Sequence, residues 1–236
     1  MAAKQAVAEV VHLRGGRLLL AAIPSLSACW LPEVIRSFRE QFPKVELVLL
    51  EESSERVAEL VELGRAELGF LQLPVKSGKL LETRELVKEP FVVLVPSGHA
   101  LARQKSVPLA QCAQEPFVFY KGRAGDTAFA ACRMAGFEPR VGCESSELAT
   151  IRSLVDVGLG LAIVPKLAAR ELPQGVVALT LREPRLERKL GLIYRCGHEW
   201  SPAATKGLCI NNRFTWRCVL DQSCSSIHRG SRGSGG

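Results

Sequence analysis

A chain of 236 residues can form one large domain or two small ones, and 47% hydrophobic with 23% charged residues is typical of a globular protein. The net charge of +7 is concentrated near the C-terminal end, so it does not by itself predict a nucleic-acid-binding surface. The apolar runs are too short or too interrupted to cross a membrane, and the first residues do not resemble a secretion signal, so we expect a cytoplasmic protein with no membrane partner.

Strands and helices alternate along the first hundred residues. Short runs rich in Leu and Val predict strands, and apolar residues at helical spacing predict the helices between them. The predicted strands are 17–23, 45–51, 67–73 and, after a charged edge segment at 80–89, 91–96, and the predicted helices are 31–42 and 53–64. Because these strands are apolar on both faces, we expect a parallel sheet covered on both sides.

The same alternation starts again after Pro96. Asp126 is the predicted N-cap of the longest helix in this part. The predicted strands are 116–120, 139–144, 160–165, 175–181 and 188–195, and the predicted helices are 108–113, 126–137 and 145–157. Two similar α/β units suggest two lobes, with a ligand cleft where the chain crosses between them.

The G-x-G at Gly158 and Gly160 invites comparison with a nucleotide-binding loop. That fingerprint needs a strand before the glycines, a helix after them and a third glycine three residues on. Here a helix precedes, a strand follows, and residue 163 is Ile. We therefore expect Gly158 to end a helix in the left-handed conformation and Gly160 to permit close packing at the next strand.

Motifs for catalysis and for cofactors are missing from the sequence. It contains no G-x-S-x-G elbow, H-E-x-x-H or P-loop, and the eight cysteines form no C-x-x-C pair. We therefore predict no enzyme activity, no cofactor and no metal, and we expect His99 to position a loop. The cysteines at 29, 112, 132 and 143 are expected to act as small hydrophobic residues. One further zinc candidate matches no standard spacing: Cys209, Cys218, Cys224 and His228.

Several segments together resemble the effector-binding region of LysR-type transcriptional regulators. They are "AIPSLSACWLPEVIRSFREQFPKVELVLLEESSERVAELVELGRAELGFL", "PSGHALA" and "ESSELATIRSLVDVGLGLAIVP", and the pattern covers about residues 15–203. The resemblance implies two Rossmann-like lobes of periplasmic-binding-protein type (type 2), which hold a small effector in the cleft between them. It also implies a dimeric or tetrameric gene regulator without catalysis. Two alternatives stay open, a stand-alone solute-binding protein of the same fold and a non-functional regulator fragment.

The resemblance also suggests how the chain is divided. Residues 1–16 look like the end of a linker helix, and 205–236 form a tail of different composition that we expect to be disordered. The lobes between them are predicted at 17–96 plus 186–204 (lobe I) and 97–185 (lobe II). Since the winged helix-turn-helix of the family has no counterpart here, we expect no sequence-specific DNA binding by this chain alone.

Serines follow two predicted strands of lobe I, where helices begin. Ser25, Leu26 and Ser27 follow the first strand, and Ser53 follows the second. Serines at such positions cap helices by default. Hydroxyls and free N–H groups at a helix start can also hold a carboxylate or phosphate, and the resemblance places both turns at the cleft. Capping and ligand binding therefore both stay open for these residues.

Lobe II repeats this arrangement with charged residues. Tyr120, Lys121 and Arg123 follow the strand at 116–120, and Glu144 and Ser145 follow the next. Cations in loops are usually only solvated, but two cations and a phenol beside a helix start can form an anion clamp. Ser145 has capping as its default role, and Glu144 can accept a hydrogen bond from a ligand. We expect the effector to be a small anion, such as a carboxylate or an aromatic acid.

The helix at 31–42 is the candidate for pairing between copies of the chain. Its apolar stripe, with Trp30 beside it, is wider than a single core contact requires. The alternative is that Trp30 packs inside lobe I.

Overall fold

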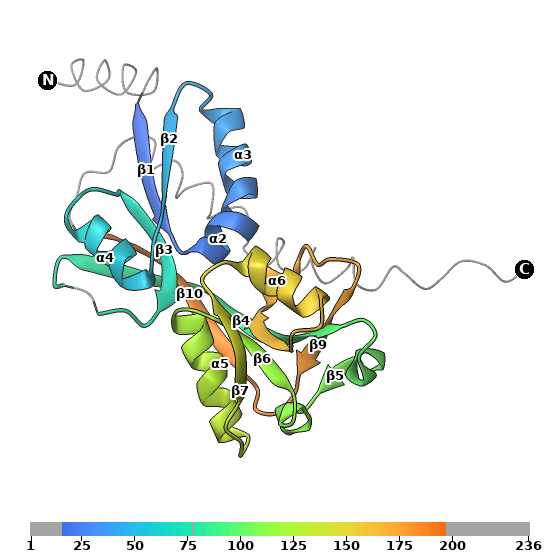
Figure 1. Cartoon of the computed structure of the whole chain (residues 1–236). Helices are drawn as coiled ribbons and strands as arrows, with labels where there is room; N and C mark the ends of the chain where they lie inside the picture. The colour runs from blue at the N-terminus through green and yellow to red at the C-terminus, as the bar shows by residue number, and fades with distance from the viewer. Residues whose placement is uncertain (1–15, 77, 197–236) are drawn as a thin grey trace, which may run out of the picture. The chain divides into compact units, whose positions relative to one another are not determined.

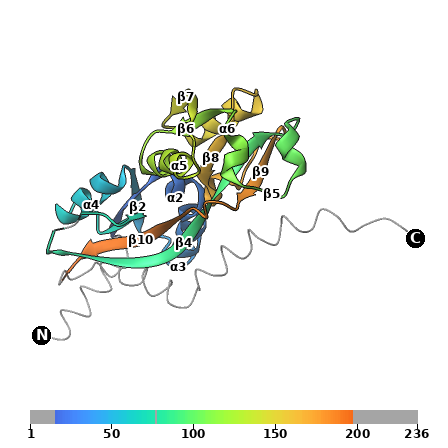
Figure 2. The ribbon, with the colours of Figure 1, turned by 90° about the horizontal axis from the view of Figure 1, so that it is seen from below.

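The computed structural model describes residues 16–76 and 78–196, which form two compact units. Unit 1 contains the described residues up to Val87 and from Gly191 onward, and unit 2 is Lys88–Leu190. The sequence pattern instead places the crossovers at 96/97 and 185/186. The difference arises because β4 and β10 continue without a break where the chain changes unit, side by side in the sheet (Figure 2): β4 is Leu81–Pro96 and β10 is Glu187–Arg195. The predicted linker-helix remnant up to residue 15 and the predicted tail lie outside the described residues.

Unit 1 has helices on both faces of its strands (Figure 1). Its elements, besides parts of β4 and β10, are β1 (Arg17–Ala22), α2 (Pro24–Cys29), α3 (Leu31–Gln41), β2 (Glu46–Glu51), α4 (Ser54–Glu62) and β3 (Leu68–Leu73). β1 pairs in parallel with both β2 and β3. A Cβ atom on Gly69 would meet Val57 and Val61, so α4 packs against this face of β3.

Trp30 packs inside unit 1, as the alternative interpretation has it. The side chain is only 5% exposed, and its ring centroid lies 5.6 Å from that of Phe70 in β3. The backbone of Trp30 is not helical, and this residue separates α2 from α3. Trp30 therefore contributes to the core and does not widen an exposed stripe on α3.

Unit 2 carries most of the second half of the described chain. Its elements, besides parts of β4 and β10, are η1 (Ala100–Arg103), β5 (Ser106–Val107), η2 (Leu109–Cys112), β6 (Pro116–Tyr120), α5 (Arg123–Met134), β7 (Arg140–Ser145), α6 (Leu148–Asp156), β8 (Ala162–Pro165), η3 (Lys166–Ala169) and β9 (Val176–Leu181). β6 and β7 form a parallel pair, whereas β4 pairs antiparallel with β8 and β9. The parallel sheet expected for the first three strands is thus confirmed, but it does not extend to β4, because strands buried on both faces have the same composition whichever way their neighbours run.

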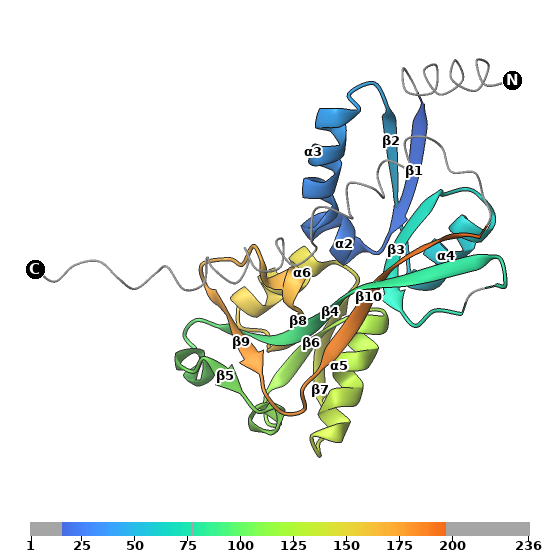
Figure 3. The ribbon, with the colours of Figure 1, turned by 180° about the vertical axis from the view of Figure 1, so that it is seen from behind.

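β6 separates two hydrophobic clusters of unit 2, with α5 and α6 on either side of it (Figure 3). Phe117 and Phe119 belong to the cluster that contains buried alanines of α5. Val118, which points to the opposite face, belongs to the cluster with Ile151 and Val155 of α6. This alternation fixes α5 at one face of β6, next to the residues that end the strand.

Two thiols lie in the α5 cluster, where they act as small hydrophobic residues. Cys112 and Cys132 are fully buried. Burial raises the pKa of Cys112 to about 11 and that of Cys132 to about 12, because the interior disfavours the charged thiolate. Both side chains therefore stay uncharged thiols at neutral pH.

A buried ion pair joins three segments of unit 2. Glu89 in β4 and Arg188 in β10 are 1% and 4% exposed. The Glu89 carboxylate accepts a hydrogen bond from Arg188 Nε at 2.7 Å and another from the backbone N–H of Leu167 at 2.6 Å. Both strands that cross the unit boundary are thereby tied to the start of η3.

Most predicted elements are confirmed to within a few residues, including 116–120 and the roles of Gly158 and Gly160. Gly158 has a φ of 79° after α6, and a Cβ atom on Gly160 would overlap the carbonyl oxygen of Pro116. Two further predictions are wrong. The charged segment at 80–89 is part of β4, and α5 begins at Arg123, so Asp126 lies inside its first turn and is not the N-cap. None of the helices in the described ranges is long and apolar enough to span a membrane.

Candidate functional site

The serine turns of unit 1 lie side by side at the carboxyl ends of two strands. Ala22 of β1 is opposite Glu51 of β2, and the backbone N–H of Glu52 donates to Ala22 O at 3.0 Å. The chain continues from β1 into α2, which contains three predicted site residues, all buried: Ser25, Leu26 and Ser27. Within the described part of the chain, the buried Ser27 hydroxyl has no hydrogen-bond partner.

Ser53 caps α4, so the capping interpretation of this residue is confirmed. Its hydroxyl accepts a hydrogen bond from the backbone N–H of Arg56 at 3.3 Å. The sequence analysis missed the next residue, Ser54, which is buried and accepts a hydrogen bond from the backbone N–H of Gln72 at 3.2 Å. The Ser53 hydroxyl therefore caps α4 and the Ser54 hydroxyl joins the start of α4 to β3, while ligand binding by Ser53 stays a prediction.

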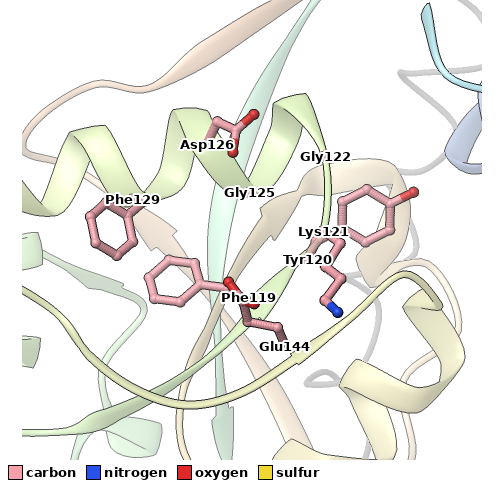
Figure 4. Close-up of a pocket in the computed structure, with 8 residues that line it drawn as sticks. All are labelled: Phe119, Tyr120, Lys121, Gly122, Gly125, Asp126, Phe129 and Glu144. Atoms are coloured by element: carbon pink, nitrogen blue, oxygen red, sulfur yellow. The ribbon is translucent and has the colours of Figure 1, made fainter.

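Unit 2 contains a hollow of about 240 Å³ where α5 begins beside β6 and β7 (Figure 4). Three predicted site residues line it, namely Tyr120, Lys121 and Glu144, whereas Arg123 and Ser145 do not. The other lining residues are Phe119, Gly122, Gly125, Asp126 and Phe129. The hollow therefore combines the end of β6, one residue of β7 and one face of the first turns of α5.

Two glycines build this hollow. Gly122 precedes α5 with a φ of 122°, a conformation that glycine adopts readily, and no side chain caps the helix. A Cβ atom on Gly125 would overlap the carbonyl oxygen of Tyr120, so glycine allows α5 to start directly against the end of β6. The turn is thus formed by backbone, and no side chain of its own fills the space.

The missed lining residues follow a helical pattern. Gly125, Asp126 and Phe129 lie in α5 at i, i+1 and i+4, on one face of its first turns, and Gly122 is the non-helical residue directly before the helix. The sequence analysis placed the start of this helix at Asp126, so it assigned Gly122 and Gly125 to a loop. The face that Gly125 shares with Asp126 and Phe129 was therefore not predicted. A helix start at Arg123 would have revealed it.

The hollow carries charges that no ion pair between described residues neutralises. Lys121, Asp126 and Glu144 are exposed, and none of their side chains makes an ion pair with another residue of the described ranges. The aromatic rings of Phe119 and Phe129 lie with centroids 5.4 Å apart. A small molecule in this hollow can therefore meet one cation, two carboxylates and an aromatic wall.

Comparison with known proteins identifies the family. The family model for the LysR substrate binding domain matches residues 12–206. The chain belongs to this family. The dual regulator GltC of Bacillus subtilis (strain 168) is 30% identical over 210 residues, which are 86% of this chain and 68% of GltC.

Solved LysR structures confirm the predicted fold of periplasmic-binding-protein type. The effector-binding domain of BenM with its effector benzoate matches 90% of this chain and 94% of its own, with a TM-score of 0.73 and 20% identity. The effector-binding domain of QuiR in complex with shikimate matches 86% of this chain and 98% of its own, with a TM-score of 0.72 and 20% identity.

The remaining predicted residues of this LysR domain have roles inside unit 2. The Ser145 hydroxyl accepts a hydrogen bond from the backbone N–H of Glu147 at 3.1 Å, but Glu147 is itself the N-cap residue of α6, so Ser145 does not cap that helix and its capping interpretation is wrong. Arg123 is the first residue of α5, outside the lining of the hollow. Of the two cations only Lys121 lines this hollow, and the anion clamp of Lys121 and Arg123 stays a prediction.

His99 positions a loop, as expected. Its Nδ1 accepts a hydrogen bond from the backbone N–H of Leu101 at 3.2 Å, and its Nε2 lies 3.3 Å from a carboxylate oxygen of Glu115. Within the ranges that the structure describes, no group of three His, Cys, Asp or Glu side chains is arranged to hold a metal ion. The zinc candidate formed by Cys209, Cys218, Cys224 and His228 lies outside those ranges.

Proposed function

We propose that this LysR substrate-binding domain binds a small effector and that the hollow of unit 2 forms part of its site. The observation that carries the proposal is the gathering of three charges, which form no ion pair among the described residues, and two aromatic rings around one hollow at the carboxyl end of β6. Ligands of α/β proteins bind at such strand ends. Two proteins of the same fold are described with small acids, benzoate in BenM and shikimate in QuiR, which supports a ligand of this size.

The serine turns of unit 1 are a second candidate region for effector contacts. The buried Ser27 hydroxyl supports this, because a polar group without a partner is costly unless something else hydrogen-bonds to it. Ser25, Leu26 and Ser53 remain predicted contacts in the same turns.

A thermal-shift screen of small metabolites tests the proposal. A ligand present at one hundred times its dissociation constant should stabilise the protein by about 2.7 kcal/mol. Lys121→Met should weaken that stabilisation, because Lys121 lines the hollow, whereas Lys105→Met, at an exposed lysine away from the lining, should leave it unchanged. If the ligand stabilised both variants equally, it would bind outside this hollow.

We further propose that this domain acts in the cytoplasm as part of a transcription regulator, with no catalytic role. The family match to regulators supports this assignment. An effector that binds but has no influence on any regulator partner would instead favour the stand-alone solute-binding protein. No effector at all would favour the non-functional fragment. The absence of operator recognition by this chain alone stays a prediction, which a gel-shift assay with promoter and scrambled DNA tests.

Self-association is proposed through one side of unit 1. β2 ends the strand order of its sheet, and its residues 47–50 are half-buried, as are Val34 and Ile35 of α3. An edge strand of this kind offers unpaired backbone groups to a second copy of the chain. Sedimentation that shows only monomer at tens of micromolar would contradict this proposal, because interfaces of standard size form in that range.

A further inference from the structure

We infer that the hollow of unit 2 selects a small zwitterion, an ammonium carboxylate such as an α-amino acid with an apolar side group. This inference rests on the proposed effector function and names the ligand class for the same hollow. It replaces the simple anion expected from the sequence, for which the loop at 119–126 was interpreted as a clamp of cations.

The first argument is the excess of negative charge around the hollow. Asp126 lies on α5 and Glu144 on β7, so carboxylates reach the hollow from two different elements (Figure 4). No described residue neutralises either of them with an ion pair, and Arg123, the second cation of the expected clamp, is not part of the lining. A ligand that carries only a carboxylate would meet like charges, which disfavours it. An ammonium group on the ligand would pair with them.

The second argument is that the hollow also has a positive region. Lys121 lines it beside the start of α5, a helix of 12 residues whose N-terminus no side chain caps. The helix dipole favours an anionic group at such a start. Gly122 and Gly125 also line the hollow, so no side chain keeps a ligand away from this backbone. A carboxylate is therefore matched here, while the ammonium group is matched by the acidic residues.

The third argument concerns the size and the apolar part of the ligand. Phe119 and Phe129 line the hollow as a tilted aromatic pair, and the Arg133 guanidinium lies 5.1 Å from the ring centroid of Phe129. A volume of about 240 Å³ is smaller than the roughly 300–1,000 Å³ of sites for drug-sized molecules. The hollow therefore suits a molecule with one compact apolar group between its two charges and the aromatic wall.

Three compounds that differ only in charge test this ligand class on the intact chain. They are L-phenylalanine, 3-phenylpropionate, which lacks the ammonium group, and 2-phenylethylamine, which lacks the carboxylate. L-leucine, 4-methylpentanoate and 3-methylbutylamine form the matching aliphatic series. Calorimetric titration should show the zwitterion of at least one series binding about tenfold tighter than its acid or its amine, since a charge-assisted hydrogen bond contributes about 1.5–3 kcal/mol.

Two variants assign each preference to a side chain. Glu144→Gln should lower the zwitterion-to-acid affinity ratio by about threefold or more, because one of the two carboxylates that can pair with the ammonium group is lost. Lys121→Met should do the same for the zwitterion-to-amine ratio. Glu171→Gln and Lys105→Met change the same charges at exposed positions outside the lining and should leave both ratios as they are.

The outcomes separate this inference from the proposed function. The inference is overturned if the acids or the amines bind as tightly as the zwitterions, or if Glu144→Gln leaves the ratio unchanged. It is also overturned if the wider metabolite screen finds an effector that carries no ammonium group, in which case effector binding itself stands. If no compound of any charge stabilises the protein, the proposed effector function fails together with the inference.

Discussion

Unit 1 and unit 2 use the same strand–turn–helix arrangement, but they complete the turn with different groups. At the start of α4 in unit 1, the Ser53 and Ser54 hydroxyls accept hydrogen bonds from backbone N–H groups. At the start of α5 in unit 2, Gly122 and Gly125 have no side chains, and a hollow remains. The comparison shows that turn residues decide whether a strand end is closed by the protein or left open to a ligand.

The two units also treat charge differently. The described ion pairs of unit 1, Arg17 with Glu46 and Arg56 with Glu59, are all substantially exposed. Unit 2 has exposed pairs as well, Arg133 with Glu138 and Arg185 with Glu187, but it also buries the pair of Glu89 and Arg188. Water screens the exposed pairs but not the buried one, so breaking the buried pair of unit 2 should have a much larger effect than breaking a pair of unit 1.

The largest expected effect comes from breaking the buried pair. Arg188→Met should lower the free energy of unfolding by about 3–5 kcal/mol, because it leaves the Glu89 carboxylate buried with one hydrogen bond fewer. Arg56→Met, which breaks the exposed pair on α4, should have a much smaller effect, because water screens that pair. Urea unfolding of both variants measures the difference. Adding Glu89→Gln to Arg188→Met should restore part of the loss, and similar costs for the two single variants would break the comparison.

A smaller effect is expected at the start of α5. Alanine normally stabilises a helix by up to about 1 kcal/mol relative to glycine, but the Cβ atom of Gly125→Ala would overlap the Tyr120 carbonyl oxygen. The overlap should reverse the sign and destabilise the protein by about 1–3 kcal/mol, since α5 must move away from β6. Gly98→Ala is the control, because no atom lies within 4 Å of its Cβ position. A Gly125→Ala variant as stable as the control would mean that the close approach of α5 is not required.

The third expected effect appears at alkaline pH and belongs to unit 2. The pKa values of Cys112 and Cys132 are raised to about 11 and 12 in the folded protein, above about 8.5 in the unfolded chain. Their contribution to stability is therefore complete below about pH 8.5. It is lost as the pH rises, by up to about 1.4 kcal/mol per pH unit for each thiol.

Urea unfolding at several pH values between 8 and 10.5 measures this slope. Cys132→Ala removes one of the two thiols, so the free energy of unfolding should fall less steeply with pH than in the parent protein. An unchanged slope would show that Cys132 ionises as easily in the folded protein as in the unfolded chain.

The parts of the fold that could be predicted from sequence depend on residues close together in the chain. The spacing of apolar residues within a short segment indicates a strand or a helix, so β6 and the α6–Gly158–β8 connection were predicted correctly. The start of α5 was missed because glycines are poor helix formers and Asp126 has the chemistry of an N-cap. The lining of the hollow was then only partly predicted, since Phe129 and Gly125 join it only when the helix begins at Arg123.

Long-range pairing could not be predicted from the sequence. Glu89 and Arg188 are 99 residues apart, and nothing near either residue marks it as buried. Likewise, the charged first half of β4 has the composition of a surface loop, although it is a strand. Both features depend on which segments meet in the folded sheet, which the local sequence does not encode.

The place of β10 has a consequence for the order in which the protein is made. β10 lies between β3 and β4 in the sheet, yet it is the last described strand of the chain. A ribosome therefore releases all of unit 2 before it releases the residues from Gly191 onward that unit 1 needs. The unit that begins first is completed last, and until then the edge of β3 is open to pairing with other nascent chains.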